Sequence, residues 1–269
     1  MPTKMVLIHG AWLTSLSWEL WVPYFEKRGY DVVAPEWPRK DVSVEKMNAD
    51  PAGLAGLGVA EIVDHYASIV GALPEPPVII GHSFGGLFTQ LLLDRGLGAA
   101  GVALDPAPPK GVLRITWSEL KATSPVLAHP SNRRGVAALT FEQFAFGFTN
   151  TFSKSDARAA YERYVVPETG RIFFEDGLAN FSLHSPIAID FDNGDRAPLL
   201  ITGGGKDNQV PTAVTWADFT KYRRSAARTD YVEFPGAPHM LMVGDGWEAI
   251  AERVGGWLDE VLAVSDARD

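Results

Sequence analysis

The chain has 269 residues, of which 46% are hydrophobic and 21% charged, and it contains no cysteine. This composition is typical of one large globular domain, or of one domain with an insertion, and it can fill a sizeable core. The formal net charge of −9 argues against nucleic acid and anionic membranes as partners, and the lack of cysteine excludes disulfides, thiolate catalysis and cysteine metal ligands.

The N-terminus leads from Met1 directly into a short apolar run, with no long apolar segment behind it. We therefore expect neither a signal peptide nor a transmembrane span, and a cytoplasmic location is the default. The sequence does not indicate an oligomeric state, because core helices account for its apolar faces.

The first hundred residues alternate between short apolar runs and helical patterns. The segment 11–29 has a helix-like apolar face, 38–58 is predicted as a loop, and 59–73 carries the clearest helical stripe. A further helix is predicted from Phe84 to about Arg95. The predicted strands of this part are 5–8, 31–35, the apolar run 78–80 before the Gly81 turn, and 101–105. This alternation predicts an α/β fold with a doubly wound, mostly parallel sheet.

The alternation lapses between residues 107 and 196, which are predicted as helices and loops without a clear buried strand. It resumes with strands at 198–203 and 231–234, a helix over about 212–227, and a final helix over about 247–263 before a frayed tail at 265–269. We therefore expect a core made of 1–106 and 197–269, and a helical cap made of 107–196. Such a cap would lie over the carboxyl ends of the strands, where open α/β sheets bind ligands.

Four aromatic residues of the predicted cap share one helical stripe: Phe141, Phe144, Phe148 and Phe152. They form either the cap's own core or an apolar wall of a substrate pocket. Phe144 and Phe148 are the candidates for the pocket.

The sequence Gly81-His82-Ser83-Phe84-Gly85 stands between an apolar run and a helical pattern. A serine in a Gly-x-Ser-x-Gly turn from strand to helix stands clear of the backbone at the top of a sheet, on a strained turn for which the glycines make room. The motif is short and also occurs by chance, but the strand before it and the helix after it are the context it requires. Ser83 is therefore the candidate nucleophile.

A serine needs a base within hydrogen-bond reach, and the base needs a partner that orients it. His239 follows the last predicted strand, and Asp207 follows the strand at 198–203, so they are the candidate base and orienting acid. Asp105 is the rival acid, because it also ends a predicted strand. His82 is expected to point away from Ser83.

His9-Gly10-Ala11-Trp12 ends the first predicted strand. The backbone N–H groups of Ala11 and Phe84 are the candidates for an oxyanion hole, and His9 is expected to brace this loop. Trp12 either lines the substrate pocket or is a buried tryptophan.

Together these segments resemble the α/β-hydrolase family over nearly the whole chain. The resemblance rests on His9-Gly10, on 81–86, on Gly205-Lys206-Asp207 and on His239, in the Ser…Asp…His order of that family. The His-Gly-Ala-Trp start is similar to the branch that holds plant methylesterases and hydroxynitrile lyases. The resemblance implies a cap inserted between two core strands, a small-molecule substrate, and no metal or organic cofactor.

The predicted activity is hydrolysis of an ester-type bond (carboxylic ester, lactone or thioester) in a small hydrophobic substrate, through an acyl-enzyme on Ser83. The alternative is non-hydrolytic chemistry with His239 as base, as in the hydroxynitrile lyases and cofactor-independent dioxygenases of this family. The lyases rely on a lysine near the histidine, and Lys206 is the possible substitute here. A third reading is a binding module, as in the hormone receptors of this fold.

Overall fold

The computed structural model describes residues 2–114 and 116–266, and its centre is a six-stranded sheet. The strands lie in the order β2-β1-β3-β4-β7-β8, and each neighbouring pair is parallel. Their bounds are β1 Lys4–Ile8, β2 Asp31–Val33, β3 Val78–His82, β4 Ala100–Leu104, β7 Leu199–Gly204 and β8 Thr229–Phe234. Because the chain starts in the interior and winds to one edge and then to the other, the sheet is doubly wound, which confirms the predicted fold class.

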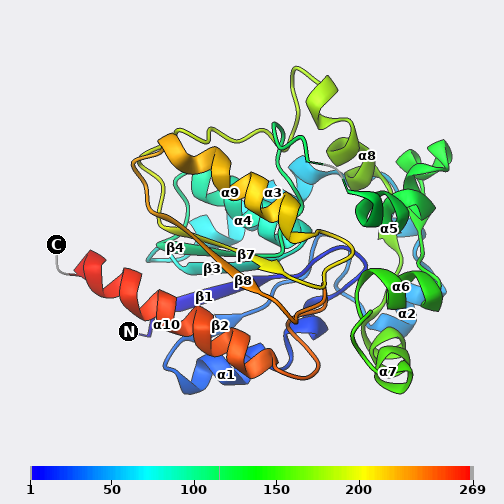
Figure 1. Ribbon diagram of the computed structural model, residues 1–269, viewed down its shortest axis with the longest axis horizontal. Coiled ribbons are helices and arrows are strands. Elements are labelled where there is room, and N and C mark those ends of the chain that lie inside the picture. The colour runs from blue at the N-terminus through cyan, green and yellow to red at the C-terminus, as the bar shows by residue number, and fades with distance from the viewer. Residues whose placement is uncertain (1, 115, 267–269) are drawn as a thin grey trace.

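Helices cover both faces of this sheet (Figure 1). On one face α1 lies beside α10, and on the other α3, α4 and α9 lie together. The bounds of these helices are α1 Trp21–Lys27, α3 Val59–Gly71, α4 Phe84–Asp94, α9 Thr212–Lys221 and α10 Trp247–Asp266. Parallel strands covered on both faces are apolar throughout, as in β3, all of whose residues are buried.

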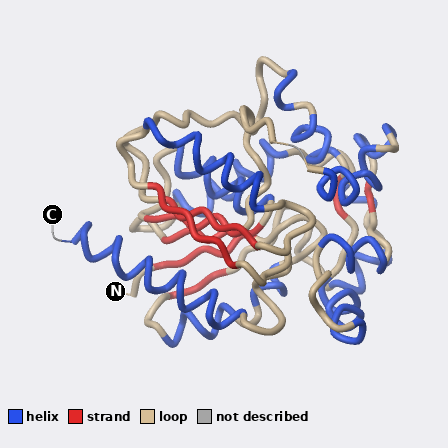
Figure 2. The backbone as a smooth tube through the Cα atoms, viewed as in Figure 1, coloured by secondary structure: helices blue, strands red, loops and turns tan. Residues whose placement is uncertain are grey.

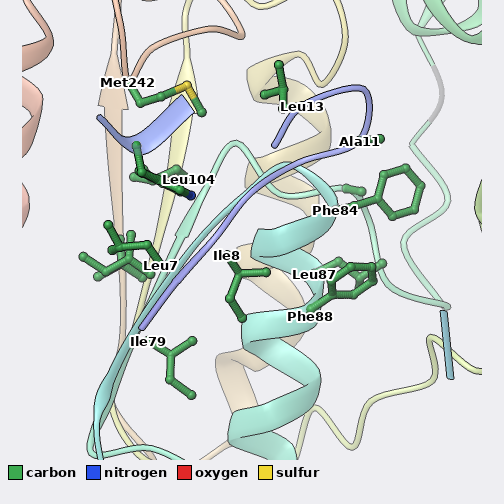
Figure 3. Packing of buried hydrophobic residues seen from close by; sticks show 14 of the residues in the cluster. Leu7, Ile8, Ala11, Leu13, Ile79, Phe84, Leu87, Phe88, Leu104 and Met242 are labelled. Atoms are coloured by element: carbon green, nitrogen blue, oxygen red, sulfur yellow. The ribbon is translucent and has the colours of Figure 1, made fainter. Parts of the chain in front are cut away.

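Buried apolar side chains pack together where β1, β3 and α4 meet (Figure 3). Ile8 of β1, Leu87 and Phe88 of α4, and Leu104 of β4 have no exposed surface. This packing fixes the position of the turn between β3 and α4.

Within 107–196, the predicted cap, a group of helices lies at one end of the sheet (Figure 1). Two short strands there pair antiparallel, apart from the main sheet (Figure 2). The cap elements are α5 Trp117–Leu127, η3 Pro130–Arg134, β5 Val136–Ala137, α6 Phe141–Gly147, α7 Lys154–Tyr164, β6 Glu168–Thr169, α8 Arg171–Gly177 and η4 Ala179–Phe181. The prediction that 107–196 contains no clear buried strand was therefore wrong for β6. Its two residues are fully buried, but two residues are too few to give a recognisable sequence pattern.

The cap and core boundaries at 106 and 197 stay a prediction. Within 107–196, the last stretch runs back along the core: Asn193 bonds to Asp94 at the end of α4, and the Phe191 ring packs on Tyr222 after α9.

Several other segments differ from the predicted elements, either in length or because they contain short helices that were not predicted. The predicted loop 38–58 contains α2, Val44–Ala49, which Ser43 caps by accepting a hydrogen bond from the Lys46 amide, and the 3-10 turn η2, Ala52–Leu54. Segment 11–29 holds the 3-10 turn η1, Ser15–Trp18, before α1, and η5, Tyr222–Arg224, follows α9. The predicted tail begins inside α10, and residues 267–269 lie outside the described part. No helix of the described residues is long and apolar enough to cross a membrane.

Candidate active site

Ser83 lies in the turn between β3 and α4 with φ 56° and ψ −120°, a strained conformation for a residue other than glycine. Its N–H donates to the Leu104 carbonyl at 2.9 Å, which ties the turn to β4. Only glycine fits on either side: a Cβ on Gly81 would lie 2.0 Å from the Gly85 carbonyl oxygen, and one on Gly85 would lie 2.2 Å from that of Ile8. The motif therefore has the sharp geometry that its sequence predicts.

Asp207 lies in the loop after β7, with its side chain fully buried. One carboxylate oxygen accepts the backbone N–H groups of Gln209 (2.6 Å) and Val210 (2.8 Å). The other is 2.6 Å from Nδ1 of His239, in the loop after β8. The structure thus brings the predicted base and the predicted acid into direct contact.

The backbone of His239 is held from two sides. Nε2 of His82 donates to the His239 carbonyl at 2.8 Å, and the next amide, Met240, donates to the Phe148 carbonyl at 2.9 Å. His82 thus points toward the segment that carries the candidate base and ties it to the end of β3. Sequence reasoning missed this role, because the partner atom is a backbone carbonyl far along the chain.

Burial lowers the pKa of the His239 imidazole to about 3, so the ring is neutral at pH 7. Its Nδ1 carries the proton that bonds to Asp207, which leaves Nε2 as the basic atom. Nε2 is buried and has no hydrogen-bond partner among the described residues, Ser83 included. In ligand-free enzymes the bond between base and nucleophile is often long and tightens when substrate binds.

The candidate oxyanion hole lies where the loop after β1 passes the start of α4 (Figure 3). A Cβ on Gly10 would lie 3.0 Å from Cβ of Ser83, so this loop is in close contact with the nucleophile turn. Phe84 opens α4, and an amide in the first turn of a helix has no partner within the helix. Within the described residues the Ala11 amide donates no hydrogen bond either. Both N–H groups are available to a ligand oxygen.

His9 braces this loop. Its Nδ1 is 2.8 Å from the Gly10 carbonyl and its Nε2 is 3.3 Å from the Trp37 amide. The His9 ring also stacks on the Trp37 ring, with centroids 4.9 Å apart.

Trp12 is 1% exposed, which identifies it as a buried tryptophan. It joins the loop after β1 to the cap by three hydrogen bonds: its N–H donates to Glu168 (3.2 Å), its carbonyl accepts from the Val166 amide (2.9 Å), and its indole donates to the Ala137 carbonyl (3.1 Å). Lys40 donates to the same Glu168 oxygen at 2.5 Å, and both side chains are fully buried. Sequence reasoning missed this ion pair, because 38–58 has the composition of a solvated loop.

Phe144 and Phe148 stack at 5.1 Å and are almost fully buried. The Phe148 ring also meets the His239 ring edge-on, with centroids 4.9 Å apart. Phe144 contacts Tyr161 within the cap. Phe148 therefore belongs to the wall of the candidate site, while Phe144 belongs to the cap's core behind it. Phe152 lies beyond α6 and lines a separate surface cavity of about 530 Å³.

Asp105, the rival acid, is also at this site. It follows β4 with φ 44° and has no exposed surface. Its carboxyl oxygens accept from the Thr202 hydroxyl and the Gly204 amide, both at 3.1 Å. One of these oxygens lies within 4.8 Å of a carboxylate oxygen of Asp207. The structure therefore places the base next to Asp207 and places Asp105 behind that acid.

Among the described residues, one group of three acidic or imidazole side chains lies close enough to hold a metal ion: Asp105, Asp207 and His239. The two aspartates already accept backbone amides, and Nδ1 of His239 is bonded to Asp207. This donor set fits a hydrogen-bonded chain, and the predicted independence from metals and cofactors stays a prediction.

A family model described as the alpha/beta hydrolase family matches residues 5–253. The chain belongs to this family. A search of curated proteins found no match.

Several solved structures share the fold at low sequence identity. A methylesterase from Arabidopsis is 12% identical with a TM-score of 0.67, over 96% of this chain and 99% of its own. A pyrethroid hydrolase from Sphingobium faniae is 19% identical with a TM-score of 0.65, over 96% and 97%. Tomato methylketone synthase I, in complex with 2-tridecanone, is 15% identical with a TM-score of 0.69, over 97% and 99%.

Proposed function

We propose that this protein is a serine hydrolase that cleaves an ester-type bond of a small hydrophobic substrate through an acyl-enzyme on Ser83. The observation that carries the proposal is the buried 2.6 Å contact between His239 Nδ1 and Asp207, together with a serine held in a strained turn. Membership of the alpha/beta hydrolase family supports it, and hydrolases of esters are among the proteins that share the fold.

In the proposed mechanism, Nε2 of His239 takes the proton of the Ser83 hydroxyl while Oγ attacks the substrate carbonyl. The oxyanion that forms accepts hydrogen bonds from the Ala11 and Phe84 amides. His239 then gives its proton to the leaving alcohol, and the acyl-enzyme remains. A water molecule, deprotonated by the same Nε2, hydrolyses this intermediate and restores Ser83. Asp207 keeps the imidazole in the tautomer that leaves Nε2 basic, and stabilises its charged form.

Aromatic rings near the nucleophile favour an apolar acyl or alcohol portion. Phe84 follows Ser83, and its ring packs edge-on against Phe173 of α8 at 5.2 Å. Phe173 in turn lies 4.4 Å from the Trp12 ring. A carbonyl held at the Ala11 and Phe84 amides would have these rings beside it.

The lyase alternative receives less support. Lys206, the lysine next to Asp207, is exposed, and its amide is used in a hydrogen bond to the Ala237 carbonyl. The products decide between the two chemistries, because a lyase releases an aldehyde or ketone without consuming water.

The test is hydrolysis of p-nitrophenyl esters from short to long acyl chain. We expect Ser83→Ala to lower kcat by about four to six orders of magnitude, because nothing replaces the nucleophile. Ser68→Ala is the matched control: the hydroxyl of this exposed serine of α3 donates to the Asp64 carbonyl of its own helix, so the variant should keep wild-type turnover. Wild-type turnover by folded Ser83→Ala would overturn the proposal. Tight binding of esters with no turnover by wild type would favour the binding module instead.

A further inference from the structure

Asp105 and Asp207 are two buried carboxyl groups that lie close together beside His239. An oxygen of each aspartate and a ring nitrogen of His239 all lie within 4.8 Å of one another. Asp105 is 0% exposed and Asp207 5%. Two carboxylates this close and this buried cannot both be ionised, so the pair holds one proton.

The surrounding donors indicate which aspartate is ionised. Asp207 accepts three N–H groups, from Gln209, Val210 and the His239 ring, at 2.6 to 2.8 Å. Asp105 accepts one N–H, from Gly204, and the Thr202 hydroxyl, both at 3.1 Å. More and shorter N–H donors favour the negative charge on Asp207, which leaves the proton on Asp105.

Burial raises the pKa of Asp105 well above its ordinary value, and the neighbouring charge of Asp207 raises it further. Burial also raises the pKa of Asp207, to about 7, and the hydrogen bond from Asp105 opposes this rise. Three other titratable groups interact with these residues. Tyr231 of β8 interacts electrostatically with Asp105, Glu119 of α5 does so with Asp207, and the ring centroid of His82 lies 4.6 Å from that of His239.

We infer that Asp105 is a protonated positioning residue, which donates its carboxyl proton to Asp207 and thereby holds that carboxylate against His239. The inference deepens the proposed function and rests on it for its catalytic consequence. The hydrogen bond from Asp105 delocalises the negative charge of Asp207 and lowers the affinity of the Asp207 carboxylate for a proton. The proton between Asp207 and His239 therefore stays on Nδ1 when the imidazole becomes charged during Ser83 attack.

The left-handed backbone of Asp105 suits this arrangement. Asp and Asn adopt φ near 44° more readily than other residues that have a side chain. Asp105→Asn therefore keeps the backbone and supplies an N–H donor to Asp207 at every pH, with the loss of one accepting oxygen. Asp105→Ala removes the donor.

The catalytic test compares kcat and KM of Asp105→Asn, Asp105→Ala and Asp207→Asn on an ester that wild type hydrolyses. We expect Asp105→Ala to lower kcat by about 10- to 150-fold with KM nearly unchanged, the range for one hydrogen bond to a charged group. Asp105→Asn should lose less than about tenfold, and Asp207→Asn about 10⁴-fold, because it favours the wrong imidazole tautomer. If Asp105→Asn lost as much as Asp207→Asn, Asp105 would be the ionised acid and the inference would be wrong.

The shared proton is tested without any substrate, by urea unfolding between pH 6 and 9. A carboxyl whose pKa is raised by folding takes up a proton on folding, so its contribution to stability falls as pH rises toward the folded-state pKa. Asp105→Asn removes this pH dependence of stability. The difference in urea midpoint between the variant and wild type should therefore grow in favour of the variant as pH is raised. A constant difference would mean that the pair holds no proton.

Asp218→Asn is the matched control. Asp218 of α9 is fully buried, bonds to Gln90 at 2.9 Å, and has its pKa raised to about 7 by burial. This variant should also gain stability relative to wild type as pH rises through 7, but should keep wild-type turnover. Because the unfolding measurement needs no activity, failure of the proposed hydrolase function and failure of this inference give different results.

Discussion

At the scale of single residues, the candidate site depends on positions that accept only one type of residue. Gly85 is such a position, because the backbone of β1 passes directly over it: a Cβ there would meet the Ile8 carbonyl oxygen at 2.2 Å and that of His9 at 2.7 Å. These contacts are with backbone atoms of a buried strand and its exit loop, which cannot move aside without opening the oxyanion loop.

We therefore expect Gly85→Ala to destabilise the fold by about 3 kcal/mol or more, the upper range of overpacking, and to abolish turnover. Equilibrium unfolding in urea measures the first effect. Gly53→Ala, at an exposed position with no atom within 4 Å of the added Cβ, is the control and should unfold near the wild-type midpoint. Equal midpoints for the two variants would contradict the steric account.

Residue-scale prediction from sequence succeeded for the sharp turn at Ser83 and for the contact between Asp207 and His239. Their roles stay proposals until the variants are measured. The sequence left Asp105 and Asp207 as rivals, because each follows a strand at the same edge of the sheet. The structure shows that the two carboxyl groups lie together at the same site, a relation that the spacing of the two residues could not express.

At the scale of elements, the last helix has two adjacent glycines with the same helix propensity but different tertiary surroundings. α10 contains adjacent glycines near its middle. Gly256 is exposed, with no atom within 4 Å of an added Cβ, whereas a Cβ on Gly255 would lie 2.9 Å from the Arg28 guanidinium of the segment after α1.

Gly256→Ala should stabilise the protein by about 0.5–1 kcal/mol, because alanine loses less backbone freedom in a helix than glycine does. Gly255→Ala should stabilise the protein less, because the Arg28 guanidinium would have to move. That guanidinium pairs with Asp259 of α10. Thermal unfolding of the two variants beside wild type is the measurement. A larger gain for Gly255→Ala would show that the contact with Arg28 has no influence.

The elements were largely predictable where apolar periodicity was sustained, as in α3 and β3. They were not predictable where tertiary contacts select short pieces. β5 and β6 have two residues each, and α2 depends on a Ser43 cap in a segment with loop-like composition.

At the scale of the whole molecule, the cap and the sheet are joined by a buried ion pair. Lys40, from the segment after β2, also donates to the Leu13 carbonyl at 2.9 Å, so it holds both the loop after β1 and the cap residue Glu168. A buried pair of this kind is costly to break, because the remaining charge has no partner and no water.

Lys40→Met should lower the free energy of unfolding by about 3–5 kcal/mol, and the double variant Lys40→Met/Glu168→Gln should recover much of this loss. The control is Arg95→Met, which breaks the exposed pair with Asp64 and should change stability by less than about 1 kcal/mol. The measurement is urea unfolding of wild type, Lys40→Met, the double variant and Arg95→Met. If Lys40→Met behaved like Arg95→Met, the buried pair would not join the two parts.

The sequence by itself determined the alternation of strands and helices, the sharp turn at Ser83 and the order of the three candidate catalytic residues. These properties are local, because periodicity, glycine positions and motif spacing are written in neighbouring residues. Only the tertiary structure decided that His82 holds the backbone of His239, that Trp12 and Glu168 link the loop after β1 to the cap, and that Asp105 lies behind Asp207. Each of these contacts joins residues far apart in the chain, and each is selected by the need to pair polar groups that the fold buries.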